Sequence, residues 1–428
     1  MLYPRHRLDV SVHDLLFGLS ACLWAFRRRK LTAEVVRACP PGDDALVCFS
    51  VRSGFDLLLG ALAETAGSEV LVSAVTHPDM VRIIDGHQLR AVPVDLETET
   101  LEPRVELLEA ALTSRTRAVV VAHLFGGRFD LRPVAAFARA HGLLLVEDCA
   151  QAFRGPRDPG DPLSDVSMFS FGSIKTASAV GGAILRVRHP GLLAKMRRAQ
   201  ERWPVQGRRH YAGRLLKALC LVLLGRPLPY GIVARICKLT GRDLDDLVNG
   251  TVRAFPASAG ATESLLGEIQ HRPSAPLLAL LARRLRAFDT NRLARRTAAG
   301  ERVARLLPAF VHHPGELASP RTHWLFHVLA SDPEGLVCGL RQRGFDASRV
   351  TSSIAPVPAP PDLPRLAPEE ANRMMSHLVF LPVYPELPEG ALDRLAGAVG
   401  EVGGIGTELE SRGGAPAGPG SGTVPWSG

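Results

Sequence analysis

Two short stretches decide the fold and the chemistry of this chain: Met168–Lys175, MFSFGSIK, and Leu143–Gln151, LLLVEDCAQ. The upstream stretch, LLLVEDCAQ, reads as a buried parallel strand that ends on the carboxylate of Asp148. The downstream stretch ends in a Ser/Gly-rich turn that carries Lys175, and Gly181-Gly182 follow closely. A carboxylate at a strand end and a lysine in a tight loop suit pyridoxal phosphate (PLP) chemistry. The lysine amine forms a Schiff base, and the acid pairs with the pyridinium nitrogen.

Lysine is rare in this chain, which gives Lys175 more weight. The sequence has 51 Lys and Arg residues, and the lysines among them are Lys30, Lys175, Lys195, Lys217 and Lys238. Arginine cannot take the place of a Schiff-base lysine, because its guanidinium stays protonated. A lysine kept within an apolar run therefore favours a chemical role for Lys175. The alternative is a surface lysine whose stem packs on apolar neighbours.

Strand-like segments recur at intervals that leave room for helices between them. They are Leu46–Val51, Glu69–Val75, Arg90–Asp95, Arg117–His123, Gly142–Glu147, Val166–Phe171 and Gly182–Val187. Several are continuous apolar runs, which is typical of strands buried on both faces. The pattern predicts an α/β fold with a mainly parallel sheet. Ligands in such sheets bind at the carboxyl ends of strands, where we expect His77, His123, Asp148 and Ser170.

The segments EDCAQA (Glu147–Ala152) and FSFGSIK (Phe169–Lys175) resemble those of the DegT-type sugar aminotransferases, which are PLP enzymes of fold type I. Other segments follow in the family's order, namely SGFDLLLGAL from Ser53, VTH ending at His77, AHLFG ending at Gly126, and LPVY ending at Tyr384. The resemblance implies an aspartate aminotransferase-like fold. In this fold a large domain with a mainly parallel seven-stranded sheet carries a smaller α+β C-terminal domain.

The resemblance also implies a role for particular residues. Lys175 would bind PLP and act as general acid and base, and Asp148 would keep the pyridine nitrogen protonated. Ser53-Gly54-Phe55, at the start of a helix, would bind the phosphate through backbone amides, and Ser170 would add a hydroxyl group. On its own, Ser-Gly before a helix is simply an N-cap.

Two further residues match family positions near the cofactor. His77 matches the residue whose ring stacks on PLP, and Gln151 matches a residue near its phenolic oxygen. Three positions depart from the family: Phe55 replaces a threonine, Gly172 a histidine, and Val180 a glutamate. We expect the last two to remove polar groups near the mouth of the site and to favour a less polar acceptor.

The resemblance implies a transaminase that moves an amino group from glutamate or glutamine to a keto-sugar. A nucleotide-linked sugar is the expected acceptor, in amino sugar biosynthesis for secondary metabolites or cell-surface glycans. One alternative is a lipid-linked or polyketide-derived ketone, and another is a non-catalytic PLP-binding regulatory protein. Related sugar dehydratases carry histidine in place of the lysine, so Lys175 argues against that activity. A homodimer is expected from the family.

Composition and residue spacing limit which other partners and cofactors we expect. The net charge of +8 favours anionic ligands, but we find no nucleic-acid motif and expect no nucleic-acid partner. We find no zinc-ligand spacing and expect no metal. The seven cysteines are scattered, which predicts reduced thiols and a cytoplasmic protein.

The chain divides into four expected parts. Residues 1–44 form an N-terminal amphipathic helical segment, and residues 45–276 form the large PLP-binding domain with an apolar insertion at about 211–250. Residues 277–402 form a linking helix (Leu277–Leu307) and the small domain, and residues 403–428 form a disordered tail. The apolar segments 10–30 and 211–250 either pack on the core or a partner subunit, or make peripheral contact with a membrane.

Overall fold

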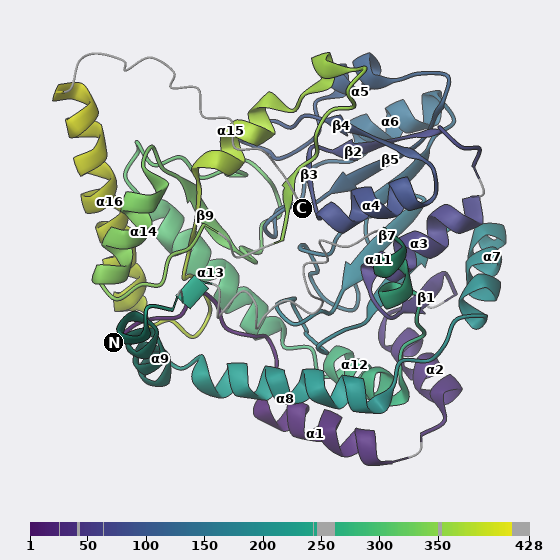
Figure 1. Ribbon diagram of the computed structural model, residues 1–428, viewed down its shortest axis with the longest axis horizontal. Helices are drawn as coiled ribbons and strands as arrows, with labels where there is room; N and C mark the ends of the chain where they lie inside the picture. The colour runs from purple at the N-terminus through teal and green to yellow at the C-terminus, as the bar shows by residue number, and fades with distance from the viewer. Residues whose placement is uncertain are drawn as a thin grey trace.

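A seven-stranded sheet in the order β1-β8-β7-β6-β5-β2-β4 forms the centre of the computed structural model (Figure 1). The structure describes residues 1–24, 26–40, 43–62, 64–242, 244–245, 262–349 and 353–412. The strands are β1 (Ala45–Cys48), β2 (Glu69–Ser73), β4 (Arg90–Val94), β5 (Thr116–Ala122), β6 (Leu144–Asp148), β7 (Val166–Ser170) and β8 (Ala183–Val187). All neighbours pair in parallel except β8, which is antiparallel to both β1 and β7. The expected seven strands and mainly parallel sheet are confirmed.

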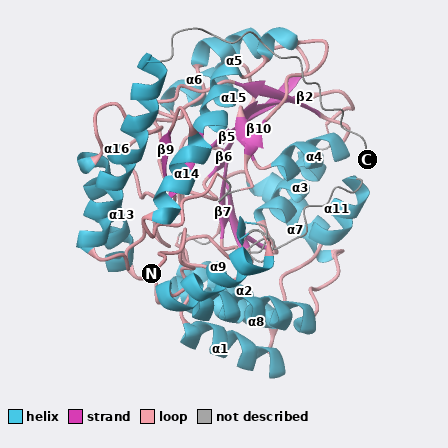
Figure 2. Ribbon diagram, turned by 60° about the vertical axis from the view of Figure 1, so that its left-hand side comes forward, coloured by secondary structure: helices cyan, strands magenta, loops and turns pink. Residues whose placement is uncertain are grey.

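Helices cover both faces of the sheet, as the continuous apolar strands require (Figure 2). One face packs on α3 (Val51–Leu62), α4 (Pro78–Gly86), α7 (Pro190–Glu201) and α11 (Thr262–Ile269). The other face packs on α5 (Val105–Ala111), α6 (Arg132–Ala140), α2 (Arg28–Ala38) and α12 (Ala275–Arg286). Alternation along each strand divides the two cores: Val70 and Val72 face the first set of helices, and Leu71 faces the second. Both faces of the sheet are thereby kept from water.

The apolar segments flagged in the sequence form an outer helical layer. Helices α1 (Val12–Leu23) and α8 (Arg208–Leu224) pack side by side and against α12 (Figure 1). Leu15, Tyr211 and Leu215 are buried in this layer. Helix α9 (Pro227–Thr240) follows α8 at a 98° bend. Among the described helices, none is by itself long and apolar enough to cross a bilayer, although α8 and α9 would be so as a bent pair.

The C-terminal part is built around an antiparallel pair of strands, β9 (Phe326–Leu329) and β11 (Leu378–Leu381). Helices α13 (Thr290–Leu306), α14 (Pro333–Gln342) and α16 (Glu389–Arg412) enclose a separate core with this pair. Helix α15 (Glu369–His377) leads into β11, and a short helix, η1, spans Pro364–Leu366. The short strands β3 (Val75–Thr76) and β10 (Ala355–Pro356) join this part to the main sheet.

Two expectations about helices are wrong. The expected long helix Leu277–Leu307 is broken into α12 and α13, because Asp289 caps a new helix by accepting a hydrogen bond from the Arg292 amide at 2.9 Å. The tail expected to be disordered from residue 403 continues α16 to Arg412, since the Gly/Pro-rich sequence begins only at Gly413. Residues 246–261, which include the end of the expected apolar insertion, and residues 413–428 lie outside the described residues.

Candidate active site

Lys175 and Asp148 lie at the C-terminal edge of the sheet, Lys175 on the loop that follows β7 and Asp148 as the last residue of β6. The loop that carries Lys175 is closed at its base by hydrogen bonds from the Phe171 amide to the Gly182 carbonyl and from the Gly181 amide to the Phe171 carbonyl, both at 3.0 Å. Lys175 donates its own amide to the Gly172 carbonyl at 3.1 Å. Ser170 is the last residue of β7, directly before this loop. The loop thus fixes the backbone of the lysine.

The amine of Lys175 is covered by an aromatic ring from the C-terminal part of the chain. Its Nζ lies 4.0 Å from the centroid of the Trp324 ring. Burial lowers the pKa of Lys175 to about 8, the charge of Arg52 lowers it further, and the carboxylate of Asp148 acts in the opposite direction. Near pH 8 a large fraction of the amine is neutral and therefore nucleophilic.

Asp148 ends β6 in a partly buried position. Burial raises the pKa of this carboxyl, while the Ala150 amide, 2.8 Å from Oδ1, and the charges of Lys175 and His123 act against the rise. The backbone carbonyl of Asp148 also accepts the His123 amide at 3.0 Å. The strand end is therefore fixed while the carboxylate remains available to pair with a cation.

A buried polar network lies beneath Asp148. His123 Nε2 lies 3.0 Å from Glu147 Oε1, and the Asp161 amide donates to Glu147 Oε2 at 2.8 Å. Burial by itself would raise the pKa of Glu147, but the hydrogen bond from His123 and the charges of His123 and Arg128 hold it well below its usual range. His123, Glu147 and Cys149 offer ligand atoms close together. Arg128, 3.8 Å from Glu147, already supplies the positive charge that a metal would bring.

The residues expected to bind the phosphate, Ser53-Gly54-Phe55, do not lie at the start of a helix. Helix α3 starts before Ser53, because Ser50 caps it: the Ser53 amide donates to Ser50 Oγ and the Gly54 amide to the Ser50 carbonyl, both at 3.1 Å. The Ser53 hydroxyl donates to the Ile269 carbonyl at 2.7 Å, and the Phe55 side chain is fully buried in the core. These three residues therefore serve the helix and its packing.

The first two residues of α3, Val51 and Arg52, carry the amides that have no acceptor within the helix. Arg52 forms an ion pair with Asp79, and its charge reaches Lys175 and lowers the pKa of the amine. A helix start with a guanidinium beside it is suited to a phosphate. Sequence reasoning missed Arg52, although an arginine directly before the Ser-Gly pair was a usable signal.

The two remaining cofactor residues are placed at strand ends. His77 caps α4, where its Nδ1 accepts the Asp79 amide at 3.2 Å, and so it shares Asp79 with Arg52. Gln151 Oε1 accepts the Phe125 amide at 2.9 Å, which leaves the amide NH₂ for a ligand. Their positions are compatible with the expected contacts to a cofactor.

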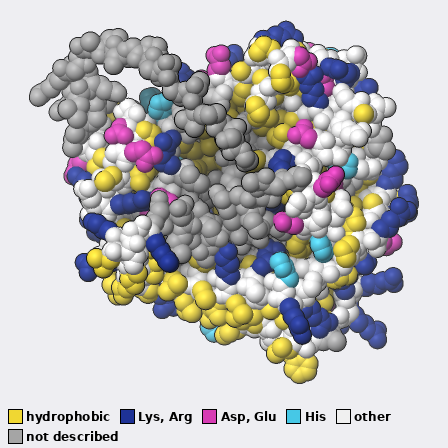
Figure 3. Space-filling model, in the orientation of Figure 1, with side chains coloured by type: hydrophobic (Ala, Val, Ile, Leu, Met, Phe, Trp, Pro, Cys, Tyr) yellow, Lys and Arg dark blue, Asp and Glu magenta, His cyan; other side chains and the backbone are white. Residues whose placement is uncertain are grey.

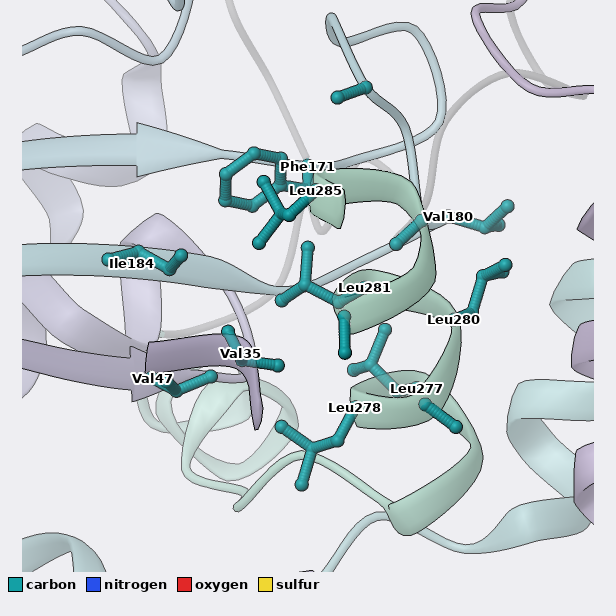
Figure 4. Close-up of a cluster of buried hydrophobic side chains, with 14 of the residues drawn as sticks. Val35, Val47, Phe171, Val180, Ile184, Leu277, Leu278, Leu280, Leu281 and Leu285 are labelled. Carbon is teal, nitrogen blue, oxygen red and sulfur yellow. The ribbon is translucent and has the colours of Figure 1, made fainter. Parts of the chain in front are cut away.

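Two further positions are fixed by contacts within the chain. Gln270 donates to Asp56 at 3.0 Å. Val180 was expected near the mouth of the site, but it is 1% exposed and packs with Leu277 and Leu280 (Figure 4). Its apolar side chain is therefore part of the core under α12.

The apolar insertion contributes a charged residue close to the loop of Lys175. A Cβ added at Gly181 would lie 3.3 Å from Nη2 of Arg214 on α8. Burial lowers the pKa of Arg214 to about 10, and the charge of Arg52 contributes to the lowering while Tyr211 opposes it. Arg52 and Arg214 therefore concentrate positive charge on one side of the site. Sequence reasoning took this helix as apolar and did not anticipate the arginine.

The residues present fit PLP. A covered amine of lowered pKa stands near a carboxylate at a strand end, and the start of α3 carries the guanidinium of Arg52. His123 Nδ1 is buried without a hydrogen-bond partner among the described residues, so the polar floor of the site is not saturated.

Comparisons with known proteins agree with this arrangement. Residues 41–213 match the model of the DegT/DnrJ/EryC1/StrS aminotransferase family. A GDP-perosamine synthase from Caulobacter vibrioides is 30% identical over 198 residues, which cover 45% of this chain and 53% of the relative. A dTDP-3-amino-3,4,6-trideoxy-alpha-D-glucose transaminase from Micromonospora megalomicea subsp. nigra is 37% identical over 146 residues, or 32% of this chain and 39% of the relative. The chain thus spans about half, or less, of the length of these relatives.

Among solved structures, the aminotransferase TlmJ from Streptoalloteichus hindustanus has the same fold. Its TM-score is 0.66 at 19% identity, over 95% of this chain and all of the other. At this identity the likeness establishes the fold, and the expected PLP fold type I is confirmed.

Proposed function

Because residues 41–213 match the model of the DegT/DnrJ/EryC1/StrS aminotransferase family, we propose that this protein is a PLP-dependent aminotransferase that aminates a keto-sugar. One observation carries the proposal. The Lys175 amine, with its pKa lowered to about 8, is covered by Trp324 and lies within electrostatic reach of Asp148. A lysine so placed is suited to bind a carbonyl covalently and to move protons.

When bound, PLP supplies an aldehyde that captures amines and a ring that withdraws electrons from them. Lys175 Nζ would hold the cofactor through that aldehyde and, as a free neutral amine, would accept and return the proton of the donor's α-carbon. Asp148 would pair with the ring nitrogen and keep a proton on it. The start of α3 and the Arg52 side chain would hold the phosphate. Trp324 keeps water from the amine.

Positive charge near the site supports an anionic acceptor such as a nucleotide-linked keto-sugar. Arg52 lies close enough to Arg214 and to Lys175 for its charge to lower the pKa of both. The names of two relatives point to the same class, a GDP-linked and a dTDP-linked amino sugar. We propose glutamate or glutamine as donor and a homodimer as the assembly, by analogy with the family.

A turnover assay tests both the proposed aminotransferase activity and the proposed class of acceptor. The full chain is incubated with PLP, L-glutamate and a panel of GDP- and dTDP-linked keto-sugars, and 2-oxoglutarate is measured over time. Continued formation with at least one sugar supports the proposal. A single equivalent per active site with every sugar would contradict the acceptor class. No 2-oxoglutarate, with glutamine equally inactive, would contradict the aminotransferase activity and favour a regulatory PLP-binding protein.

A further inference from the structure

A cavity of about 540 Å³ lies beside the Lys175 loop. It is enclosed by the N-terminal segment 4–12, by α8 and α9, and by the connection from α12 to α13, and it reaches Thr176, the residue after Lys175. Small-molecule sites usually measure about 300–1,000 Å³. None of the residues assigned to PLP above lines this cavity, so it is a separate space.

One wall of the cavity is apolar. It is formed by Leu221, Val222 and Leu224 of α8, Val233 of α9, and Phe288 and Leu293. Leu224 is 47% exposed to solvent, so the apolar wall continues to the surface at the bend between α8 and α9. Hydrophobic side chains lie along the same lower edge of the molecule, interspersed with Lys and Arg (Figure 3). This wall can hold a hydrocarbon chain that enters from the surface.

The opposite wall carries a buried arginine. Arg296 is 6% exposed, donates Nε–H to the Thr322 carbonyl at 2.9 Å, and donates from Nη1 to Thr176 Oγ1 at 3.0 Å. Its Nη2 has no hydrogen-bond partner among the residues that the structure describes. A buried guanidinium with an unused donor is costly unless an anion binds it.

The other charges of the cavity leave that arginine without a carboxylate. Asp9 pairs with Arg284 at 3.0 Å and with Arg292 at 3.3 Å, and Glu386 pairs with Arg292 at 2.9 Å. Within the described parts of the chain, no carboxylate lies within 4.0 Å of the Arg296 guanidinium. The lining therefore carries more arginines than carboxylates, and Arg296 is among those without a carboxylate partner in the described residues.

We propose that this cavity binds a single-chain amphiphile with an anionic head. The head pairs with Nη2 of Arg296, and the chain lies along the apolar wall of α8 and α9 and leaves at Leu224. Charge-assisted hydrogen bonds to guanidinium are among the strongest in proteins, and burial of the hydrocarbon chain adds to the affinity with each methylene. This ligand site is independent of the proposed transamination.

Calorimetric titration with dodecyl phosphate below its critical micelle concentration tests the proposal. The full chain is used with PLP present throughout, so that phosphate groups do not compete for the start of α3. Inorganic phosphate measures the head alone, and dodecyl maltoside measures a chain with a neutral head. We expect saturable binding of one dodecyl phosphate, at least about tenfold tighter than either control ligand, because head and chain contribute together.

Two neighbouring residues of α9 allow binding inside the cavity to be distinguished from binding at the outer surface. Val233 lines the cavity, whereas Ile232 is 60% exposed and does not line it. Val233→Glu should weaken binding by about tenfold or more, because it places a carboxylate in the wall, while Ile232→Glu should change it by less than about threefold. Arg296→Gln, with its fold checked by circular dichroism, should also weaken binding.

Three results would overturn the proposal. Equal losses in Val233→Glu and Ile232→Glu would mean adsorption to the exposed face of α9. Equal affinities for dodecyl phosphate and inorganic phosphate would mean that the chain makes no contact. A titration without saturation would mean that the cavity does not bind this class of ligand.

Discussion

The Nζ atom of Lys175 lies 4.0 Å from the centroid of the Trp324 ring, so a residue of the C-terminal part of the chain covers the amine at the sheet edge. Trp324 donates its indole N–H to the Ile174 carbonyl at 2.9 Å. The backbone at Trp324 also packs closely, because a Cβ added at Gly126 would lie 2.5 Å from the Trp324 backbone nitrogen. The ring is thus held in place over the lysine.

Trp324→Ala should raise the pKa of Lys175 from about 8 toward 10.5, because water then reaches the ammonium form. The first unit of increase reduces the neutral amine at pH 8 by about fivefold and the next by about tenfold, so PLP should bind more slowly there, and the difference should shrink as the pH approaches 10.5. The pH dependence of the binding rate measures this shift. Trp324→Phe, which keeps a ring, serves as control. An inflection unchanged in Trp324→Ala would show that the ring does not set this pKa.

Asp148→Asn should separate cofactor capture from catalysis. The lysine still binds PLP, but amino transfer should slow by about 10²–10⁴-fold, because a neutral amide cannot hold the ring nitrogen protonated. The variant should also have a pKa of Lys175 below the value of about 8, since the carboxylate that opposes the lowering is gone. Single-turnover rates with glutamate measure the effect, and Asp130→Asn on the exposed surface is the control. Wild-type rates in Asp148→Asn would refute the role of Asp148 in keeping the ring nitrogen protonated.

Arg52→Ala should weaken PLP binding by about 10–100-fold while leaving the affinity for pyridoxal nearly unchanged, because pyridoxal lacks the phosphate. Equilibrium titrations of both compounds measure this. Arg82→Ala is the matched control, since Arg82 also pairs with Asp79, at 3.3 Å. An equal loss of affinity for pyridoxal would mean that Arg52 acts on the site in general and not on the phosphate.

Gly54→Ala should destabilise the fold by about 1–3 kcal/mol, because the added Cβ would lie 2.3 Å from Cδ1 of the buried Leu185. Gly213→Ala, in the middle of α8 with open space around it, should instead stabilise the protein by about 0.5–1 kcal/mol. Urea unfolding of both variants measures the contrast. Equal stabilities would mean that α3 does not approach β8 as closely as described.

Much of the large sheet could be predicted because each of its strands has a sequence pattern that can be recognised locally. Buried parallel strands are continuous apolar runs, so seven of them were visible in order, and Asp148 and Ser170 were correctly placed at strand ends. The pairing of Lys175 with Asp148 follows from adjacent parallel strands that end at one edge. None of this required knowledge of contacts far apart in sequence.

The rest of the site depends on packing that no local pattern encodes. Trp324 reaches Lys175 across 149 positions, and Arg214 reaches Gly181 from a helix that reads as apolar. Ser53 and Gly54 resemble a phosphate loop, but the cap at Ser50 sets the start of α3, and a motif alone does not locate a cap. The break before α13 did have a local signal, because Asp289 is a good N-cap.

The absorption spectrum of the purified protein with PLP, before and after L-glutamate, tests the central claim most directly. We predict a visible band in the wild type and in Lys195→Ala, an exposed-lysine control, which moves to shorter wavelength when glutamate is added. Lys175→Ala should lack that band before glutamate is added. A band of equal strength in Lys175→Ala would contradict the assignment of Lys175 as the residue that binds the cofactor.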